Sequence, residues 1–307
     1  VIAIFCGWTN SIGCSREVAG PDWRPPDILL ISVDTLRADH LPTYGYPHPT
    51  APRIDEFATE SVVFDQAYTE APFTLPAHAS MLTGLYADQH GLHERGVRLA
   101  PDVETLAQLL KDYGYRTGAF TNCYFVTAEF GFDRGFDLFD SVDDLANPRN
   151  AERTNEQVLR WFDANRDVPV FAFVHYFDVH SDWSRLPYDS PKVYRDRFAG
   201  LEPEGFRSGD GESYASHFMG KLNAEGTLYR EEERRFVKGL YDAGIAYVDE
   251  QIGILLDALR ARGRLDQTVV IITSDHGEEF QEHGKLLHTQ LYQELVRIPM
   301  IVSFPEM

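Results

Sequence analysis

Residues 27–34 read DILLISVD, a short and almost continuous apolar run that ends in an aspartate. A run of this length without regular polar alternation is typical of a strand buried on both faces of a parallel sheet. Asp34 then stands at the carboxyl end of that strand. In open α/β sheets, ligand sites gather at the carboxyl ends of strands, so Asp34 is the first candidate site residue.

Two further apolar runs, residues 268–273 (TVVIIT) and residues 170–174 (VFAFV), also end in polar clusters. The clusters that follow them are Ser274-Asp275-His276 and the group His175, Asp178 and His180. Because parallel strands end at one edge of their sheet, we expect the three clusters to converge there. The sequence thus predicts an α/β fold with a mostly parallel central sheet.

The spacing of apolar residues between these runs predicts helices. One helix is expected over residues 103–113 and a long one over about residues 231–262, where Gly263 supplies a stop signal. Residues 181–228 are rich in Gly, Pro, Ser and charged residues and have weak periodicity, which predicts a long excursion from the sheet. We expect this excursion to border a substrate cleft.

Length and composition predict one large globular domain. The chain has 307 residues, of which 43% are hydrophobic and 25% are charged, as in ordinary globular proteins. Its formal net charge of −20 argues against a nucleic-acid partner, because binding to a phosphate backbone needs a cationic surface. An acidic protein that handles an anionic substrate needs local positive charge, and a bound divalent cation supplies it.

The cysteines have no metal-ligand spacing and indicate neither a disulfide framework nor a zinc–cysteine site. We divide the chain into an N-terminal tail, residues 1–25, and a main domain, residues 26–307. The tail is apolar at its start, and Ser11-Ile12-Gly13-Cys14 loosely resembles a bacterial lipobox, which suits a truncated export or lipoprotein signal. A frayed tail explains the same residues equally well. Membrane attachment is expected only through a lipid anchor in this tail.

Asp34, Asp275 and His276 together form a candidate metal site. Alone, an aspartate after a strand is commonly a helix cap or a turn residue. A second strand that ends in Asp275-His276 changes this interpretation, because carboxylate oxygens and an imidazole nitrogen are competent ligands of a divalent cation. Two acidic loops would also repel each other without a cation between them.

Residues 71–84 (APFTLPAHASMLTG) read as a loop followed by a helix that opens near Pro76 and closes at Gly84. A hydroxyl at such a place is most often an N-cap, and this interpretation applies to Thr74. The same place also suits a nucleophile, because backbone N–H groups and the helix dipole favour an anion there. A neighbouring cation would make the hydroxyl easier to deprotonate.

These motifs, in this order, resemble the sulfatase family. The matching segments span nearly the whole chain from Pro26, which makes the resemblance far more specific than any single motif. They are residues 33–41 (VDTLRADHL) with 44–46 (YGY), 74–84 (TLPAHASMLTG), 273–278 (TSDHGE) with 282–284 (EHG), 291–294 (LYQE) and 297–302 (RIPMIV).

The resemblance implies an alkaline-phosphatase-like α/β/α sandwich and a metal-dependent hydrolase of anionic sulfate or phosphate esters. It implies that Thr74 is the nucleophile and also contacts the metal. His288 falls near a family Lys that grips the substrate anion or assists the leaving group, and His180 resembles a family His with a similar contact. An imidazole can donate or accept a proton in either role. The implied ligands of the cation, which we expect to be Ca²⁺, Mn²⁺, Mg²⁺ or Zn²⁺, are Asp34, Asp275, His276 and Thr74.

Two positions depart from the family pattern. Sulfatases with a formylglycine aldehyde need Cys or Ser followed by x-Pro-x-Arg, whereas this chain has Thr74 and, four residues later, His78. No aldehyde is therefore expected, and a Thr adduct must be hydrolysed, which is demanding for sulfate but routine for phosphate in related enzymes. Thr35 stands where many sulfatases have a second metal-binding Asp, and this lowers the ligand charge offered to calcium.

A second metal is one alternative for the remaining polar residues. Phosphatases of the superfamily bind it with an Asp-x-x-x-His pair and a later His, and Asp178, His180 and His288 offer these ligand types at a shorter spacing. In the other interpretation, His175, Asp178 and His180 contact substrate or line the pocket. His78 either hydrogen-bonds near the nucleophile or caps the pocket floor.

The leading hypothesis is an exported hydrolase, periplasmic or at the cell surface, in which the cation activates Thr74 for in-line attack on sulfur or phosphorus. One alternative is a transferase that passes the Thr74 adduct to a sugar or lipid hydroxyl. Another is a non-catalytic binder that keeps the pocket. Family members usually continue past the position of Met307 into a smaller C-terminal subdomain, so we expect part of the substrate pocket to lie outside this chain.

Overall fold

The computed structural model describes residues 24–142, 150–181, 184–208 and 215–305. The residues on which the export-signal interpretation rests lie outside these ranges. A seven-stranded sheet forms the centre of the molecule, in the order β2-β11-β7-β1-β6-β4-β5. Strand β1 (Asp27–Val33) lies in the middle and pairs in parallel with β6 (Val170–Tyr176) and β7 (Thr268–Ser274).

The three strands predicted from the apolar runs are therefore confirmed, and they are neighbours. Every residue of β6 and β7 is buried, as expected for strands covered on both faces. Strands β4 (Arg116–Thr121) and β5 (Leu138–Ser141) continue the parallel sheet on one side. On the other side β11 (Met300–Ser303) pairs antiparallel with both β7 and β2 (Val62–Val63).

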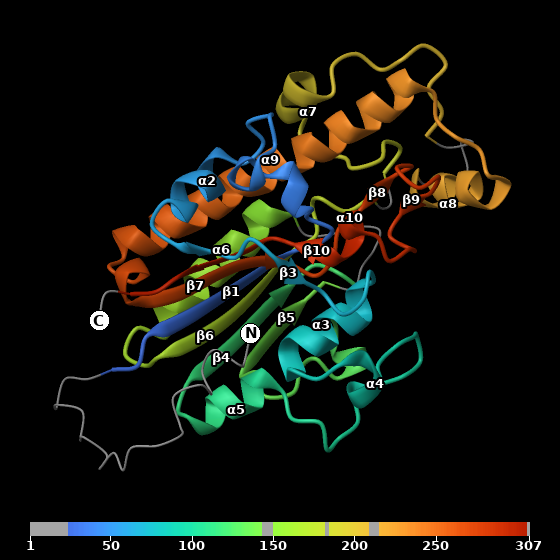
Figure 1. Cartoon of the computed structure of the whole chain (residues 1–307). Helices are drawn as coiled ribbons and strands as arrows, with labels where there is room; N and C mark the ends of the chain where they lie inside the picture. The colour runs from blue at the N-terminus through green and yellow to red at the C-terminus, as the bar shows by residue number, and fades with distance from the viewer. Residues whose placement is uncertain (1–23, 143–149, 182–183, 209–214, 306–307) are drawn as a thin grey trace.

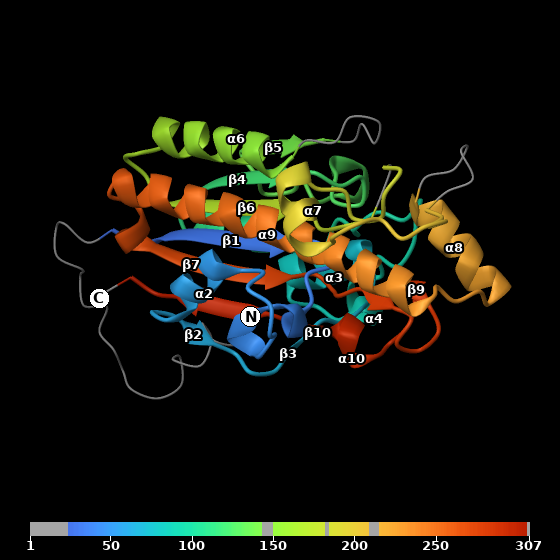
Figure 2. The ribbon, with the colours of Figure 1, turned by 90° about the horizontal axis from the view of Figure 1, so that it is seen from above.

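Helices cover both faces of this sheet (Figures 1 and 2). On one face lie α2 (Pro52–Ala58), α6 (Ala151–Ala164) and α9 (Glu231–Ala261). On the other face lie α3 (Thr74–Thr83) and α5 (Leu106–Asp112). Each face of the sheet has its own hydrophobic cluster. Alternate residues of β1 belong to the two clusters, because successive side chains of a strand point to opposite faces. The layers are those of an α/β/α sandwich.

The long predicted helix is confirmed as α9, which ends just before Gly263, at φ +66°. The helix predicted over residues 103–113 begins later, at Leu106, because the Thr105 side chain caps it by accepting a hydrogen bond from the backbone N–H of Gln108. The predicted excursion 181–228 contains two helices, α7 (Lys192–Phe198) and α8 (Ala215–Glu225). The polar composition of this segment gives too little apolar periodicity to predict these helices.

Short elements complete the fold around the carboxyl ends of the strands. They are α4 (Ala87–His90), α10 (Gln293–Val296), the antiparallel pair β3 (Ala67–Tyr68) with β10 (Arg297–Ile298), and the pair β8 (Glu279–Phe280) with β9 (Leu286–Leu287). Within the described ranges, no helix combines the length and the apolar character needed to cross a bilayer.

Candidate metal centre and active site

The carboxyl ends of β1, β6 and β7 bring the predicted polar clusters together. Asp34 follows β1 directly, and Asp275 and His276 follow β7, whose Ser274 is paired with Val33. The β6 residue His175 is paired with Ser32 in the register of β1 and β6. Convergence at one sheet edge is therefore confirmed.

The ligand atoms of Asp34, Asp275 and His276 all lie within 4.8 Å of one another, and the three side chains are buried. His276 Nε2 is 3.3 Å from Asp275 Oδ2 and 3.9 Å from Asp34 Oδ1. Two ligands of one cation, each about 2.0–2.6 Å from it, are at most about 5 Å apart. The spacing of the three predicted metal ligands therefore fits a single cation.

Hydrogen bonding leaves the appropriate nitrogen of His276 available to a metal. His276 Nδ1 lies 2.9 Å from the carbonyl oxygen of Gly277, so Nδ1 carries the proton and donates it. Nε2 then presents its lone pair toward the two carboxylates. A metal-binding imidazole is commonly oriented by such a bond on its other nitrogen.

Electrostatics also favour a cation here. Asp34 and Asp275 place two carboxyl groups in a site with no solvent exposure, and Asp275 Oδ2 has no hydrogen-bond donor among the described residues. Burial of ionised carboxylates is costly unless opposite charge balances them. Burial also lowers the pKa of His276 well below its usual value, so its imidazole is neutral, the form that binds metals. A divalent cation would neutralise the pair of carboxylates.

A second set of buried side chains is also spaced to hold a metal ion. It consists of His78, His175 and Asp275, and Asp275 belongs to both sets. His78 has partners on both nitrogens, because Nδ1 donates to the Thr74 carbonyl oxygen at 2.9 Å and Nε2 is 3.1 Å from Ser32 Oγ. This confirms that His78 hydrogen-bonds near the predicted nucleophile. The pKa of His78 and that of His175 are both lowered to about 4 by burial.

Thr74 is the first residue of α3 and not its N-cap. The N-cap is Phe73, so the interpretation of the Thr74 hydroxyl as a helix cap is wrong. The helix begins two residues before the predicted opening at Pro76, a residue that the first helical turn tolerates. Thr74 Oγ1 instead lies 3.3 Å from His276 Nε2. Its hydroxyl therefore reaches the metal-ligand group.

His180 and His288, the other two predicted catalytic residues, lie close by. The ring of His288 is 4.5 Å from that of His276 and 5.1 Å from that of His180, between centroids. His288 Nδ1 lies 3.3 Å from Glu278 Oε1. Burial acts to lower the pKa of His288, but the carboxylates of Glu278, Asp34 and Asp275 outweigh it and raise this pKa. His288 can therefore hold a proton beside the site.

A cavity of about 580 Å³ opens in front of these side chains and is lined by Thr74, His180 and His288. Much of its remaining wall is aromatic or aliphatic. Arg95 stands over the ring of Phe125 at 4.8 Å and brings a positive charge to this wall. The other lining residues are Phe73, Cys123, Tyr124, Phe177, Ser181, Ser216, His217 and Leu287.

Asp178 takes a different position from the one that the second-metal alternative requires. Its Oδ1 accepts a hydrogen bond from the backbone N–H of Ala151 at 3.1 Å, at the start of α6. Among the described residues, the groups spaced for a metal do not include Asp178, His180 or His288. The geometry groups His78 and His175 with Asp275 instead, and places His180 and His288 in the cavity wall.

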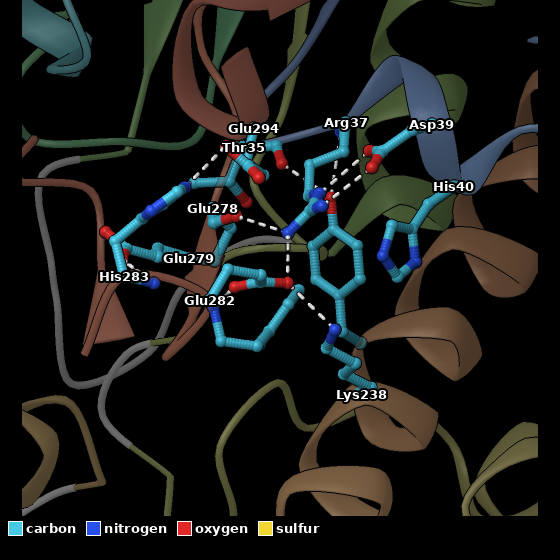
Figure 3. Close-up of polar contacts among 12 residues, drawn as sticks. Thr35, Arg37, Asp39, His40, Lys238, Glu278, Glu279, Glu282, His283 and Glu294 are labelled. Carbon is cyan, nitrogen blue, oxygen red and sulfur yellow. Dashed lines mark hydrogen bonds and ion pairs between the residues drawn. The ribbon is translucent and has the colours of Figure 1, made fainter. Parts of the chain in front are cut away.

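A buried arginine network holds the ligand-bearing loops (Figure 3). Arg37 donates to the carbonyl oxygen of Glu278 at 2.9 Å, to Glu282 at 3.1 Å and to both carboxylate oxygens of Asp39. The loop after β1 is thereby tied to the segment after β7. Arg37 lies within the motif at residues 33–41, but its local sequence indicated no role for its side chain.

Tyr241 of α9 joins the same network from a distant part of the chain. Its hydroxyl donates to the carbonyl oxygen of Thr35 at 2.6 Å and accepts from the backbone N–H of Arg37 at 2.8 Å. The backbone N–H of Thr35 in turn donates to Asp275 Oδ1 at 3.1 Å. Gly277 completes the arrangement, since an added Cβ would lie 1.8 Å from the carbonyl oxygen of Glu294.

Known proteins resemble this chain in both sequence and structure. The uncharacterized sulfatase YidJ of Escherichia coli K12 is 28% identical over 92% of this chain and 63% of its own length. The choline-sulfatase of Rhizobium meliloti is 23% identical over 91% of this chain and 63% of its own length. The chain thus spans a little under two-thirds of these two relatives.

Solved structures share the fold at low sequence identity. The phosphonate monoester hydrolase of Agrobacterium radiobacter superposes with a TM-score of 0.71 at 20% identity, over 90% of this chain and 68% of that one. The C-terminal periplasmic domain of EcEptC from Escherichia coli, in complex with Zn, has a TM-score of 0.68 at 17% identity. The superposition covers 92% of this chain and 74% of that domain. The predicted alkaline-phosphatase-like fold is confirmed. The profile of the sulfatase family matches residues 26–307, and this chain therefore belongs to the sulfatase family.

Proposed function

We propose that this chain is the catalytic part of a metal-dependent hydrolase that cleaves a sulfate or phosphate ester with Thr74 as nucleophile. One observation carries the proposal: the Thr74 hydroxyl lies between the metal-ligand group and the cavity, 3.3 Å from His276 Nε2. Because a threonine stands at this position, we also propose that the chain belongs to a branch of the family that works without formylglycine.

Asp34, Asp275 and His276 would hold the cation, and Thr74 stands within reach of the same position. When bound, a divalent cation supplies Lewis acidity and makes a neighbouring hydroxyl easier to deprotonate. The two carboxylates balance the charge of the cation, so its Lewis acidity and the positive end of the α3 dipole would together attract the anionic ester. Thr74 at the first position of α3 meets the positive end of that helix dipole.

His288 supplies the proton to the leaving oxygen. It lines the cavity, and Glu278 behind it raises its pKa, which favours the protonated ring. His180 also faces the cavity and has a pKa that burial holds well below the usual value, so it is neutral and accepts or donates single hydrogen bonds to the anion. The two histidines thus take different roles through their surroundings.

The chemistry of the nucleophile favours phosphorus over sulfur. An adduct on Thr74 has no carbonyl to re-form and is released only when water or an acceptor hydroxyl attacks it, a step that phosphate esters undergo more readily in this superfamily. One structural relative is named a phosphonate monoester hydrolase, while the curated relatives above are named sulfatases. The largely apolar cavity wall suits the alcohol part of an aryl or similarly apolar ester.

The test compares 4-nitrophenyl sulfate, 4-nitrophenyl phosphate and bis(4-nitrophenyl) phosphate as substrates for metal-depleted and metal-restored protein. We expect turnover of at least one phosphate ester that is lost with the metal and returns when the metal is restored. Adding acceptor alcohols shows whether the product is formed by hydrolysis or by transfer. If no ester is cleaved in a metal-dependent way by the full-length protein, the proposal is wrong.

A further inference from the structure

We propose that His175 is a direct ligand of this metal centre and that its imidazole takes the place of the carboxylate that Thr35 does not provide. The centre then has two nitrogen donors and selects a first-row transition metal, Zn²⁺ or Mn²⁺, over Ca²⁺. The inference rests on the proposed function only in that a cation binds between Asp34 and Asp275.

The position of His175 follows from the parallel pairing of β1 and β6. The register places His175 opposite Ser32, and the next residues of β1 lead directly to Asp34. His175 is fully buried, and its Nε2 lies 3.3 Å from Asp34 Oδ2. Its ligand atom is also within 4.8 Å of one on Asp275. The imidazole therefore borders both carboxylates of the centre.

His175 differs from the other two buried histidines of the cluster in its hydrogen bonding. His276 donates from Nδ1 to Gly277, and His78 has a partner on each nitrogen. Neither ring nitrogen of His175 has a hydrogen-bond partner among the described residues. A buried polar group without a partner costs free energy, and such groups in native proteins require an explanation. Coordination of a cation by Nε2 supplies one.

The neighbouring Thr35 explains why an additional donor is needed. Thr35 has φ +59°, and its backbone N–H holds Asp275 Oδ1 at 3.1 Å, so its backbone supports a ligand while its side chain adds no charge. The protein donors are then two carboxylates, two imidazoles and the Thr74 hydroxyl. Calcium prefers six to eight oxygen ligands, whereas mixed nitrogen and oxygen sets suit Zn²⁺ and Mn²⁺.

X-ray absorption of the Zn-loaded protein tests the ligand directly, because outer-shell scattering counts coordinated imidazoles. We expect two imidazoles in the wild type, one in His175→Asn, and Zn²⁺ affinity at least 10-fold lower in that variant. A count of one in the wild type would overturn the proposal even if His175→Asn weakens binding, since His175 would then only position Asp34. A count that stays at two in the variant would overturn it as well.

Matched controls and a second measurement keep the test decisive. His90 is also buried and lies 3.1 Å from Ser80 Oγ, outside the cluster, so His90→Asn should leave the count and the affinity unchanged. If His175→Asn does not fold, the proposal is still tested by the number of imidazoles bound to zinc in the wild type and by calorimetric competition between Zn²⁺ and Ca²⁺. Binding of Ca²⁺ as tightly as Zn²⁺ contradicts the proposal. Two imidazoles in a protein that cleaves no ester would refute the proposed function and leave the ligand assignment intact.

Discussion

The hydroxyl oxygen of Thr74 lies 3.3 Å from Nε2 of His276, although 202 residues separate them along the chain. One side chain begins a helix on one face of the sheet, and the other follows a central strand. Their contact joins the nucleophile candidate to the metal-ligand group. The catalytic proposal depends on this contact.

Replacement of Thr74 should separate the roles of its hydroxyl and its methyl group. Thr74→Ala should lower kcat by at least about 10³-fold, because the attacking oxygen is removed, while circular dichroism shows an unchanged fold. Thr74→Ser keeps the oxygen and should retain measurable turnover. Substantial kcat in Thr74→Ala, measured with the preferred phosphate ester, would contradict the nucleophile assignment.

Thr35→Asp should shift the metal preference toward calcium. The backbone at Thr35 is left-handed, a conformation that Asp tolerates better than most residues, and a carboxylate here would add a third negative charge beside Asp34 and Asp275. Without metal the variant should be less stable than the wild type, because the buried carboxylates repel. Calcium should raise its Tm by more than that of the wild type, as differential scanning fluorimetry can measure. An equal calcium response in both proteins would show that a carboxylate at position 35 does not bind the cation.

Tyr241→Phe should loosen the loop that follows Asp34. The lost hydroxyl leaves the carbonyl oxygen of Thr35 and the N–H of Arg37 without their partner in a buried site, at a cost of about 1–3 kcal/mol in the free energy of unfolding. Urea denaturation measures this loss. The control is Tyr194→Phe, whose hydroxyl donates to Glu250 in an exposed contact, and a change within about 0.5 kcal/mol is expected there. Equal losses in the free energy of unfolding in the two variants would show that the Tyr241 hydroxyl does not stabilise the loop after Asp34.

Glu282 should make the stability of the protein sensitive to acid. Burial acts to raise its pKa, but Arg37 and Lys238 outweigh burial and lower this pKa from 4.5 to about 2. Because the pKa is depressed in the folded state, the stabilisation is complete above about pH 5 and is lost as the pH falls from about 5 to about 2. Because Glu282 is partly exposed to solvent, screening reduces this contribution to about 1 kcal/mol.

Glu282→Gln should therefore reduce the loss of stability between pH 5 and pH 3, measured by urea denaturation at each pH. The exposed Glu60 makes no ion pair among the described residues, and Glu60→Gln should follow the wild-type curve. If Glu282→Gln also follows that curve, the pairing with Arg37 does not contribute to acid sensitivity.

Several parts of the site were predictable from local sequence. A buried parallel strand requires a continuous apolar run, and such runs located β1, β6 and β7 and the polar residues at their ends. Parallel strands end at one sheet edge, so the meeting of Asp34 with Asp275 and His276 followed from the pattern alone. The helix after Phe73 was expected too, although its first residue was not placed correctly.

The remaining parts depend on contacts that no local pattern encodes. His175 was noted at the end of a strand, yet the lack of hydrogen-bond partners on its imidazole appears only when the neighbouring side chains are in place. The position of Asp178 at the start of α6, and the link from Tyr241 to Thr35, join elements that are distant in the chain.

The sequence by itself determined the three central buried strands, the long helix that ends before Gly263, the candidate metal-ligand types and the family, because apolar periodicity and motif order are local properties of the chain. Only the tertiary structure decided which histidines face the carboxylates and which line the cavity. The direction of a side chain depends on strand register and on the packing of helices against the sheet, and these are set by contacts between residues hundreds of positions apart.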